Sequence, residues 1–158
     1  MDQQSEKLRQ RLLDSRRDLL AAVENLGPAE LTAPTSSAGW AVHDVLAHLA
    51  GAELGHQQVI RALLAGDTPD TTGFDLDAFN AADVAARRNA SLPALLNELA
   101  ANRLATLALL DSISPDDWDR AGYHPGGFDT TVAGVFRISA IHEKRHVKEI
   151  RAALTFGS

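Results

Sequence analysis

Apolar residues recur along this chain at spacings of three and four, and most of them are leucine or alanine. This period is typical of amphipathic helices, and the strict alternation that would indicate strands is nearly missing. The pattern predicts a first helix over residues 3–26, which Gly27 and Pro28 end. After a polar segment rich in Ser, Thr, Pro and Gly, a second helix is predicted over residues 41–65, with Gly66 closing it.

The second half of the chain contains two more helical patterns. The first covers residues 75–113 and breaks near Ser91, which can cap a new helix whose first turn tolerates Pro93. A glycine-rich loop from Gly122 onward precedes the last helix, predicted over residues 130–155. We therefore expect an all-α four-helix bundle with essentially no sheet. Long connections join helices one and two and helices three and four, and helices two and four are adjacent.

Both halves of the chain have the same layout. A long helix is followed by a proline-led turn with one apolar residue, Leu31 or Trp118, then by a polar loop, then by a helix that carries histidine. The likeness lies in the order of the elements rather than in a strict sequence repeat.

Composition narrows the function classes. The 158 residues fit a single domain, residues 1–158, that can bury a core. Cysteine is absent, which excludes disulfides, thiolate metal ligands and a thiol nucleophile of the protein's own. The net charge of -6 and the few aromatic residues disfavour nucleic-acid binding. The polar start and the lack of a long apolar stretch favour a cytoplasmic protein without a signal peptide or a membrane partner.

Histidines fall on the apolar faces of two predicted helices. His142 and His146 lie one turn apart among apolar residues of the last helix. In the second helix His48 and His56 lie on or beside the apolar stripe, whereas His43 points away. One such histidine is ordinarily a hydrogen-bonded core residue, but several imidazoles buried together would each lose hydration. A shared metal ion satisfies them all, and an i, i+4 pair presents both rings to a common point, as in helical zinc sites.

Residues 142–146 also match H-E-x-x-H, in which zinc peptidases use the glutamate as general base. Those enzymes take a third ligand downstream, and after His146 this sequence offers no histidine and only Glu149 as a carboxylate. A peptidase is therefore disfavoured. Glu143 remains a candidate catalytic residue, as a base or as a support for the ligands, with a solvated partner of Lys144 as the alternative.

Two segments resemble the DinB/YfiT-like superfamily of metal-dependent helical proteins. They are GWAVHDVLAHLAGAE over residues 39–53 and HEKRHVKEI over residues 142–150. The family includes the metal-binding domain of mycothiol-dependent maleylpyruvate isomerase and the bacillithiol transferases. The resemblance implies a DinB/YfiT-like four-helix bundle with the family's first metal ligand on His48 and its last two on His142 and His146. It also implies that two copies pair as a homodimer.

Three neutral ligands leave the full charge of a divalent ion and an open coordination position, as in catalytic sites. Imidazole suits zinc, nickel, iron or copper rather than magnesium or calcium. Together with the resemblance, the missing cysteines favour an enzyme that activates an external low-molecular-weight thiol, such as mycothiol or bacillithiol. The thiol would then attack a small electrophile in a transfer or an isomerisation. The alternatives are a metal-dependent hydrolase with water as the nucleophile and a non-catalytic protein that binds a small molecule or protects against stress.

Three further residues are candidates for binding the small-molecule substrate. Tyr123 and His124 lie in the loop before the last helix, and His56 lies two turns beyond His48. We expect these residues to wall a pocket that opens at the metal. The alternatives are an exposed loop pair and a core histidine satisfied by its neighbours.

Overall fold

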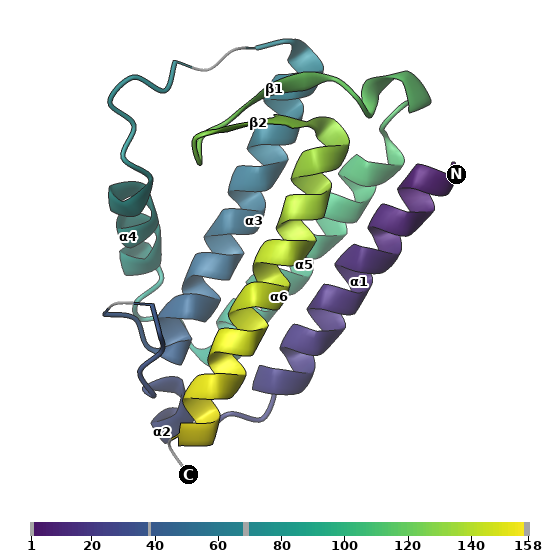
Figure 1. Ribbon diagram of the computed structural model, residues 1–158. Helices are drawn as coiled ribbons and strands as arrows, with labels where there is room; N and C mark the ends of the chain where they lie inside the picture. The colour runs from purple at the N-terminus through teal and green to yellow at the C-terminus, as the bar shows by residue number, and fades with distance from the viewer. Residues whose placement is uncertain (1, 38, 68–69, 157–158) are drawn as a thin grey trace.

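A computed structural model describes residues 2–37, 39–67 and 70–156 (Figure 1). The elements in chain order are α1 (Gln3–Val23), α2 (Pro28–Leu31), α3 (Val42–Ala65), α4 (Leu76–Ala86), α5 (Leu92–Asp111), the 3-10 turn η1 (Pro115–Asp117), β1 (Ala121–His124), β2 (Phe128–Thr131) and α6 (Val132–Phe156). No helix in the described ranges is long and apolar enough to cross a membrane.

The helices begin and end close to the predicted boundaries, and local capping explains why. The side chain of Asp2 caps α1 by accepting a hydrogen bond from the Ser5 amide at 2.7 Å. The long stretch predicted in the second half is divided into α4 and α5, and Ser91 caps α5 as expected. Gly66 ends α3 with a φ of 74°, in the left-handed region that glycine adopts without strain.

The four long helices α1, α3, α5 and α6 form a bundle in which α6 lies between α1 and α3 (Figure 1). The predicted adjacency of the second and fourth main helices is confirmed, because these are α3 and α6. The short helix α4 lies outside the bundle against α3. Two clusters of buried residues fill the interior, one containing Leu46 and Ile150 and the other containing Leu12 and Phe136.

The predicted loop before α6 is instead a β-hairpin, so that expectation was wrong. Strands β1 and β2 pair antiparallel, with His124 opposite Phe128, around a three-residue turn that ends at Gly127 with a φ of 94°. Gly122 lets β1 lie directly on α3, since a Cβ atom there would come within 2.2 Å of Leu63 Cδ2. The hairpin therefore crosses the end of the bundle where α3 ends and α6 begins (Figure 1). Strands of four residues are too short to give a clear alternating pattern.

Two arginines and two glutamates form a closed network of ion pairs inside the bundle, here called the charge network. Arg16 of α1 and Arg103 of α5 each bind both Glu53 of α3 and Glu143 of α6, with N–O distances of 2.5 to 3.0 Å. No more than 8 % of any of these four side chains is exposed. Each long helix thus contributes one buried charge, and the charges sum to zero.

Neutral groups complete the hydrogen bonding of the charge network. The Ser15 hydroxyl donates to Glu143 at 2.5 Å, the Thr106 hydroxyl donates to Glu53 at 2.8 Å, and both guanidinium groups also donate to main-chain carbonyls. Buried charges are tolerated only when they are paired in this way, and removing one partner costs about 3–5 kcal/mol. Rotating any long helix about its axis would unpair a charge, so the network fixes which face of each helix looks inward.

Replacing Glu53 by glutamine should destabilise the protein strongly. The amide keeps the shape of the side chain but leaves two buried arginines facing one carboxylate. We expect the free energy of unfolding, measured by urea denaturation, to fall by about 3–5 kcal/mol. Asp14→Asn is the control, because Asp14 pairs at 2.8 Å with Arg17, whose side chain is 70 % exposed. It should cost less than about 1 kcal/mol. Equal small losses in both variants would show that the charge network does not govern stability.

Candidate metal centre

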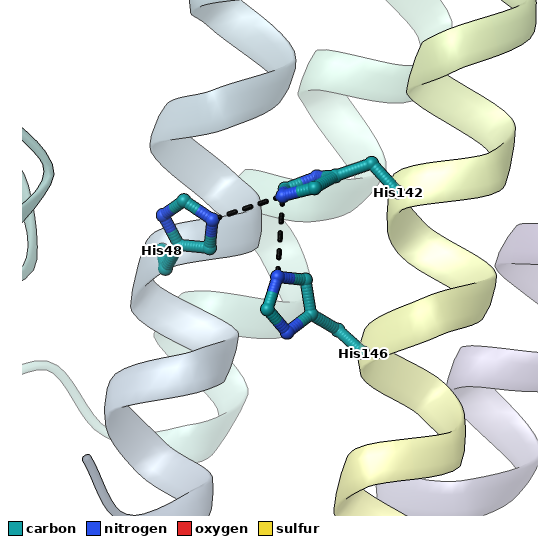
Figure 2. A group of neighbouring side chains, drawn as sticks. All are labelled: His48, His142 and His146. Carbon is teal, nitrogen blue, oxygen red and sulfur yellow. Dashed lines mark hydrogen bonds between the residues drawn. The ribbon is translucent and has the colours of Figure 1, made fainter. Parts of the chain in front are cut away.

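Three histidine side chains from two helices meet between α3 and α6 (Figure 2). The Nε2 atom of His142 lies 3.0 Å from Nε2 of His48 and 3.2 Å from Nε2 of His146. All three ligand atoms lie within 4.8 Å of one another. Nitrogen ligands about 2.0–2.1 Å from a tetrahedral ion are about 3.4 Å apart, so this arrangement fits a single metal ion.

A carboxylate fixes the tautomer of one histidine. His146 Nδ1 donates to Glu149 at 2.7 Å. Burial opposes ionisation of Glu149, but hydrogen bonds from Ser37, His146 and Thr35 outweigh it and lower the pKa of this carboxyl to about 2. With its proton on Nδ1, the His146 ring presents its Nε2 atom to the other two histidines, as a metal ligand must.

The other two imidazoles are held in the neutral form that binds metal. Burial, with a contribution from His146, lowers the pKa of His48 to about 4. Burial, with contributions from His146, His48 and His56, lowers the pKa of His142 to about 2. The Trp40 ring packs against His48 at a centroid distance of 4.9 Å and shields it. A set of neutral nitrogen donors is suited to zinc, nickel, iron or copper.

The structure brings two of the three candidate substrate residues to this cluster. The His56 ring lies 5.8 Å from the His142 ring, and the His124 ring lies 5.7 Å from the His56 ring. Tyr123 is 44 % exposed and, as the neighbour of His124 in strand β1, points to the opposite face of the hairpin. The fold therefore does not place Tyr123 at the cluster, and a role for it in substrate binding stays a prediction. His43 points away as expected, with its Nε2 atom 2.7 Å from the Ala90 carbonyl oxygen.

Glu143 is buried, so its interpretation as a solvated partner of Lys144 is wrong. Its carboxylate is 3 % exposed and accepts hydrogen bonds from Ser15, Arg16 and Arg103. These contacts make it a member of the charge network directly beside the ligand His142. They support the interpretation that it holds the ligands in place, and a role as general base stays a prediction.

A small void lies where the charge network meets the histidine cluster. Residues of both groups line it, among them Glu143, Arg103 and His142, together with His56. Its volume of about 10 Å³ is close to what one water molecule needs. The pocket predicted at the metal is therefore much narrower here than expected, and the Tyr123 to Phe128 loop does not line it.

Several residues around the site were missed from the sequence. Glu149 lies one turn after His146, and that i, i+3 spacing was a usable signal for a supporting carboxylate. Glu53 stands inside the first family-like segment and was not singled out. Arg16 and Arg103 carry no local signal, because their partners lie on other helices.

A bundle that brings three histidines from two helices to one point defines a helical metal-binding protein. The chain belongs to the DinB superfamily, whose family model matches residues 11–150. The resemblance stated from the sequence is thereby confirmed.

Two known proteins are similar to this chain. A Bacillus licheniformis protein that carries the name "Putative metal-dependent hydrolase" is 27 % identical over 136 residues, which are 85 % of this chain and 76 % of that protein. YfiT from Bacillus subtilis is described as "a probable metal-dependent hydrolase with an unusual four-helix bundle topology". It matches with a TM-score of 0.80 and 22 % identity over 99 % of this chain and 89 % of its own. The second likeness confirms the predicted four-helix-bundle fold.

Metal binding should decline in a graded series of variants. Glu149→Gln should weaken zinc binding roughly 10–100-fold, the usual effect of losing a residue that supports a ligand. His146→Ala should weaken it further, because it removes a ligand itself. Metal content by mass spectrometry and competition with a chelating dye measure the affinities. His43→Ala is the control and should bind zinc as the unaltered protein does. Stoichiometric metal in His146→Ala would refute the assigned site.

The ion-free protein should lose stability as the pH falls from about 7.5 to 5.5, because unfolded histidine has a pKa of about 6.5. Burial first, then neighbouring histidines, lowers the pKa of His48 and His56 to about 4 and that of His142 to about 2. Over this range the unfolded chain binds protons that the folded chain does not. The free energy of unfolding should therefore fall by roughly 1 kcal/mol per histidine. Urea denaturation in a chelator at both pH values measures the loss, and His56→Gln should reduce it by roughly 1 kcal/mol, the contribution of one histidine.

Proposed function

We propose that this protein is a divalent-metal-dependent enzyme and that hydrolysis of a small substrate is its reaction. The observation that carries the proposal is the convergence of three histidine ligand atoms that lie within 4.8 Å of one another. Sites with three protein ligands leave a coordination position for water or substrate, whereas structural zinc sites have four. The Bacillus licheniformis relative and YfiT, through their descriptions as hydrolases, support the choice of reaction.

The residues around the site have separate roles in this proposal. When bound, a divalent ion supplies a Lewis acid and lowers the pKa of bound water toward neutrality. Glu149 keeps His146 in the ligating tautomer, and the Trp40 ring packs against His48. Glu143 holds the turn of α6 that carries His142 against the charge network. His56 and His124 continue the line of imidazoles from His142 toward the hairpin, where substrate would be bound.

A second candidate is transfer of an external thiol, in keeping with the missing cysteines. A chain without cysteine has no sulfur nucleophile of its own, so thiol chemistry here would need a low-molecular-weight thiol such as mycothiol or bacillithiol. Coordination to a divalent ion deprotonates a thiol at neutral pH, so the same three histidines would serve. The two reactions differ in whether water or the thiol is consumed.

The test is turnover by protein stripped with a chelator and reloaded with zinc, nickel or iron. Small esters, amides and phosphate esters report hydrolysis, and loss of free thiol in the presence of small electrophiles reports transfer. We expect hydrolysis that needs the metal and is lost in His146→Ala. Lys148→Ala is the control, because Lys148 is exposed on the outer face of α6 and should leave turnover unchanged. Thiol consumption instead would establish the second candidate. Stoichiometric ligand binding without turnover would refute both enzymatic proposals.

A further inference from the structure

Two buried histidine nitrogens beside the metal centre have no hydrogen-bond partner. Within the described ranges, the buried side-chain nitrogen atoms without a partner are Nε of Arg9, Nδ1 of His56 and Nε2 of His124. The two histidine rings face each other at a centroid distance of 5.7 Å and an interplanar angle of 48°. Buried polar atoms in native proteins are nearly always paired. Two unpaired atoms on neighbouring rings therefore indicate a partner that binds to both.

The protonation of His124 follows from its main-chain neighbours. The Gly126 amide donates to His124 Nδ1 at 2.9 Å, so Nδ1 is an acceptor and the proton of the neutral ring is on Nε2. The Phe128 ring stacks on His124 at 4.6 Å with an angle of 8° and holds its orientation. The unpaired Nε2 atom is consequently a fixed hydrogen-bond donor, and it cannot ligate a metal ion. The missing partner must be an acceptor.

His56 sets the position of this acceptor relative to the metal centre. Its ring contacts both His124 and His142, at 5.7 and 5.8 Å. Nothing described here fixes the tautomer of His56, so its Nδ1 atom can supply a second donor. An oxygen atom has two lone pairs, so one acceptor between the facing rings can take a hydrogen bond from each of them.

We propose that His56 and His124 form an oxygen-binding pair that recognises a carbonyl or carboxylate oxygen of the substrate next to the metal centre. This inference rests on the proposed function, because it takes the metal centre as the place where the substrate reacts. It names the substrate class as small molecules with an acceptor oxygen near the reacting group. A substrate without that oxygen would leave both donors unpaired and would be rejected.

The experiment uses acetate as the probe and the histidine side chains as the readout. Long-range proton–nitrogen NMR spectra of the zinc-loaded, nitrogen-15-labelled protein report each ring's tautomer and its response to acetate. We expect His124 to carry its proton on Nε2 and the His56 and His124 signals to shift saturably, while His43 stays unchanged. His124→Phe keeps the stacking on Phe128 but removes the donor. It should weaken acetate binding at least about tenfold without changing zinc content.

Two controls separate the possible outcomes. Imidazole binds zinc through a ring nitrogen and offers no acceptor oxygen, so its binding should be the same in His124→Phe and the unaltered protein. His124→Gln restores a donor and should recover most of the acetate affinity. Three results would overturn the proposal. The first is a proton on Nδ1 of His124, and the second is equal acetate affinity in all three proteins. The third is the absence of a saturable shift, which would mean that a structural water alone binds there. Zinc binding and hydrolysis are measured separately. If the protein hydrolyses no substrate but its His56 and His124 signals still respond to acetate, the enzymatic proposal fails and the oxygen-binding pair stands.

Discussion

The four buried charges of Arg16, Glu53, Arg103 and Glu143 are the constraint on which the rest of the bundle depends. Apolar packing alone tolerates small rotations and slips of a helix, since one leucine contact can replace another. A buried ion pair does not, because an unpaired charge in the interior costs several kcal/mol. Glu143 follows the ligand His142 directly, and Glu53 lies on α3 little more than one turn after His48. The pairing that orients α3 and α6 for the arginines therefore also orients their histidines toward each other.

The charge network and the histidine cluster occupy different parts of the interior. The charge network is fully hydrogen-bonded, and its two positive and two negative charges cancel. This neutral group lies next to the histidine cluster, because Glu143 follows His142 in the chain. In the cluster, burial disfavours the charged forms of His48 and His142. Two histidines outside the network have tautomers set by a partner, His146 by Glu149 and His124 by the Gly126 amide. One presents a lone pair and the other a proton, as a metal ligand and a hydrogen-bond donor require.

The helices and the His142–His146 pair could be predicted from the sequence because their signals are local, whereas His48 was assigned to the same cluster from the family resemblance. Apolar spacing, Ser91 and Gly66 place the helix ends, and the i, i+4 spacing of His142 and His146 is a property of one helix. The charge network could not be predicted, because Arg16 and Arg103 meet their partners only after four helices have packed. The hairpin was missed for the opposite reason: its strands are very short, although the Pro-Gly-Gly turn between them was visible. The narrow void at the metal depends on side-chain packing, which helical periodicity does not report.

His48 and His142 stand 94 positions apart in the chain, one in each of its similarly arranged halves. An ion held by both closes a loop of that length, and closing long loops removes much of the freedom of the unfolded chain. In a protein without cysteine, a bound metal would act as a disulfide does, as a cross-link that forms without oxidation and is undone by a chelator. Because the stabilisation from a bound ligand grows with its free concentration, the resistance of this protein to heat and proteolysis would then depend on the supply of metal around it.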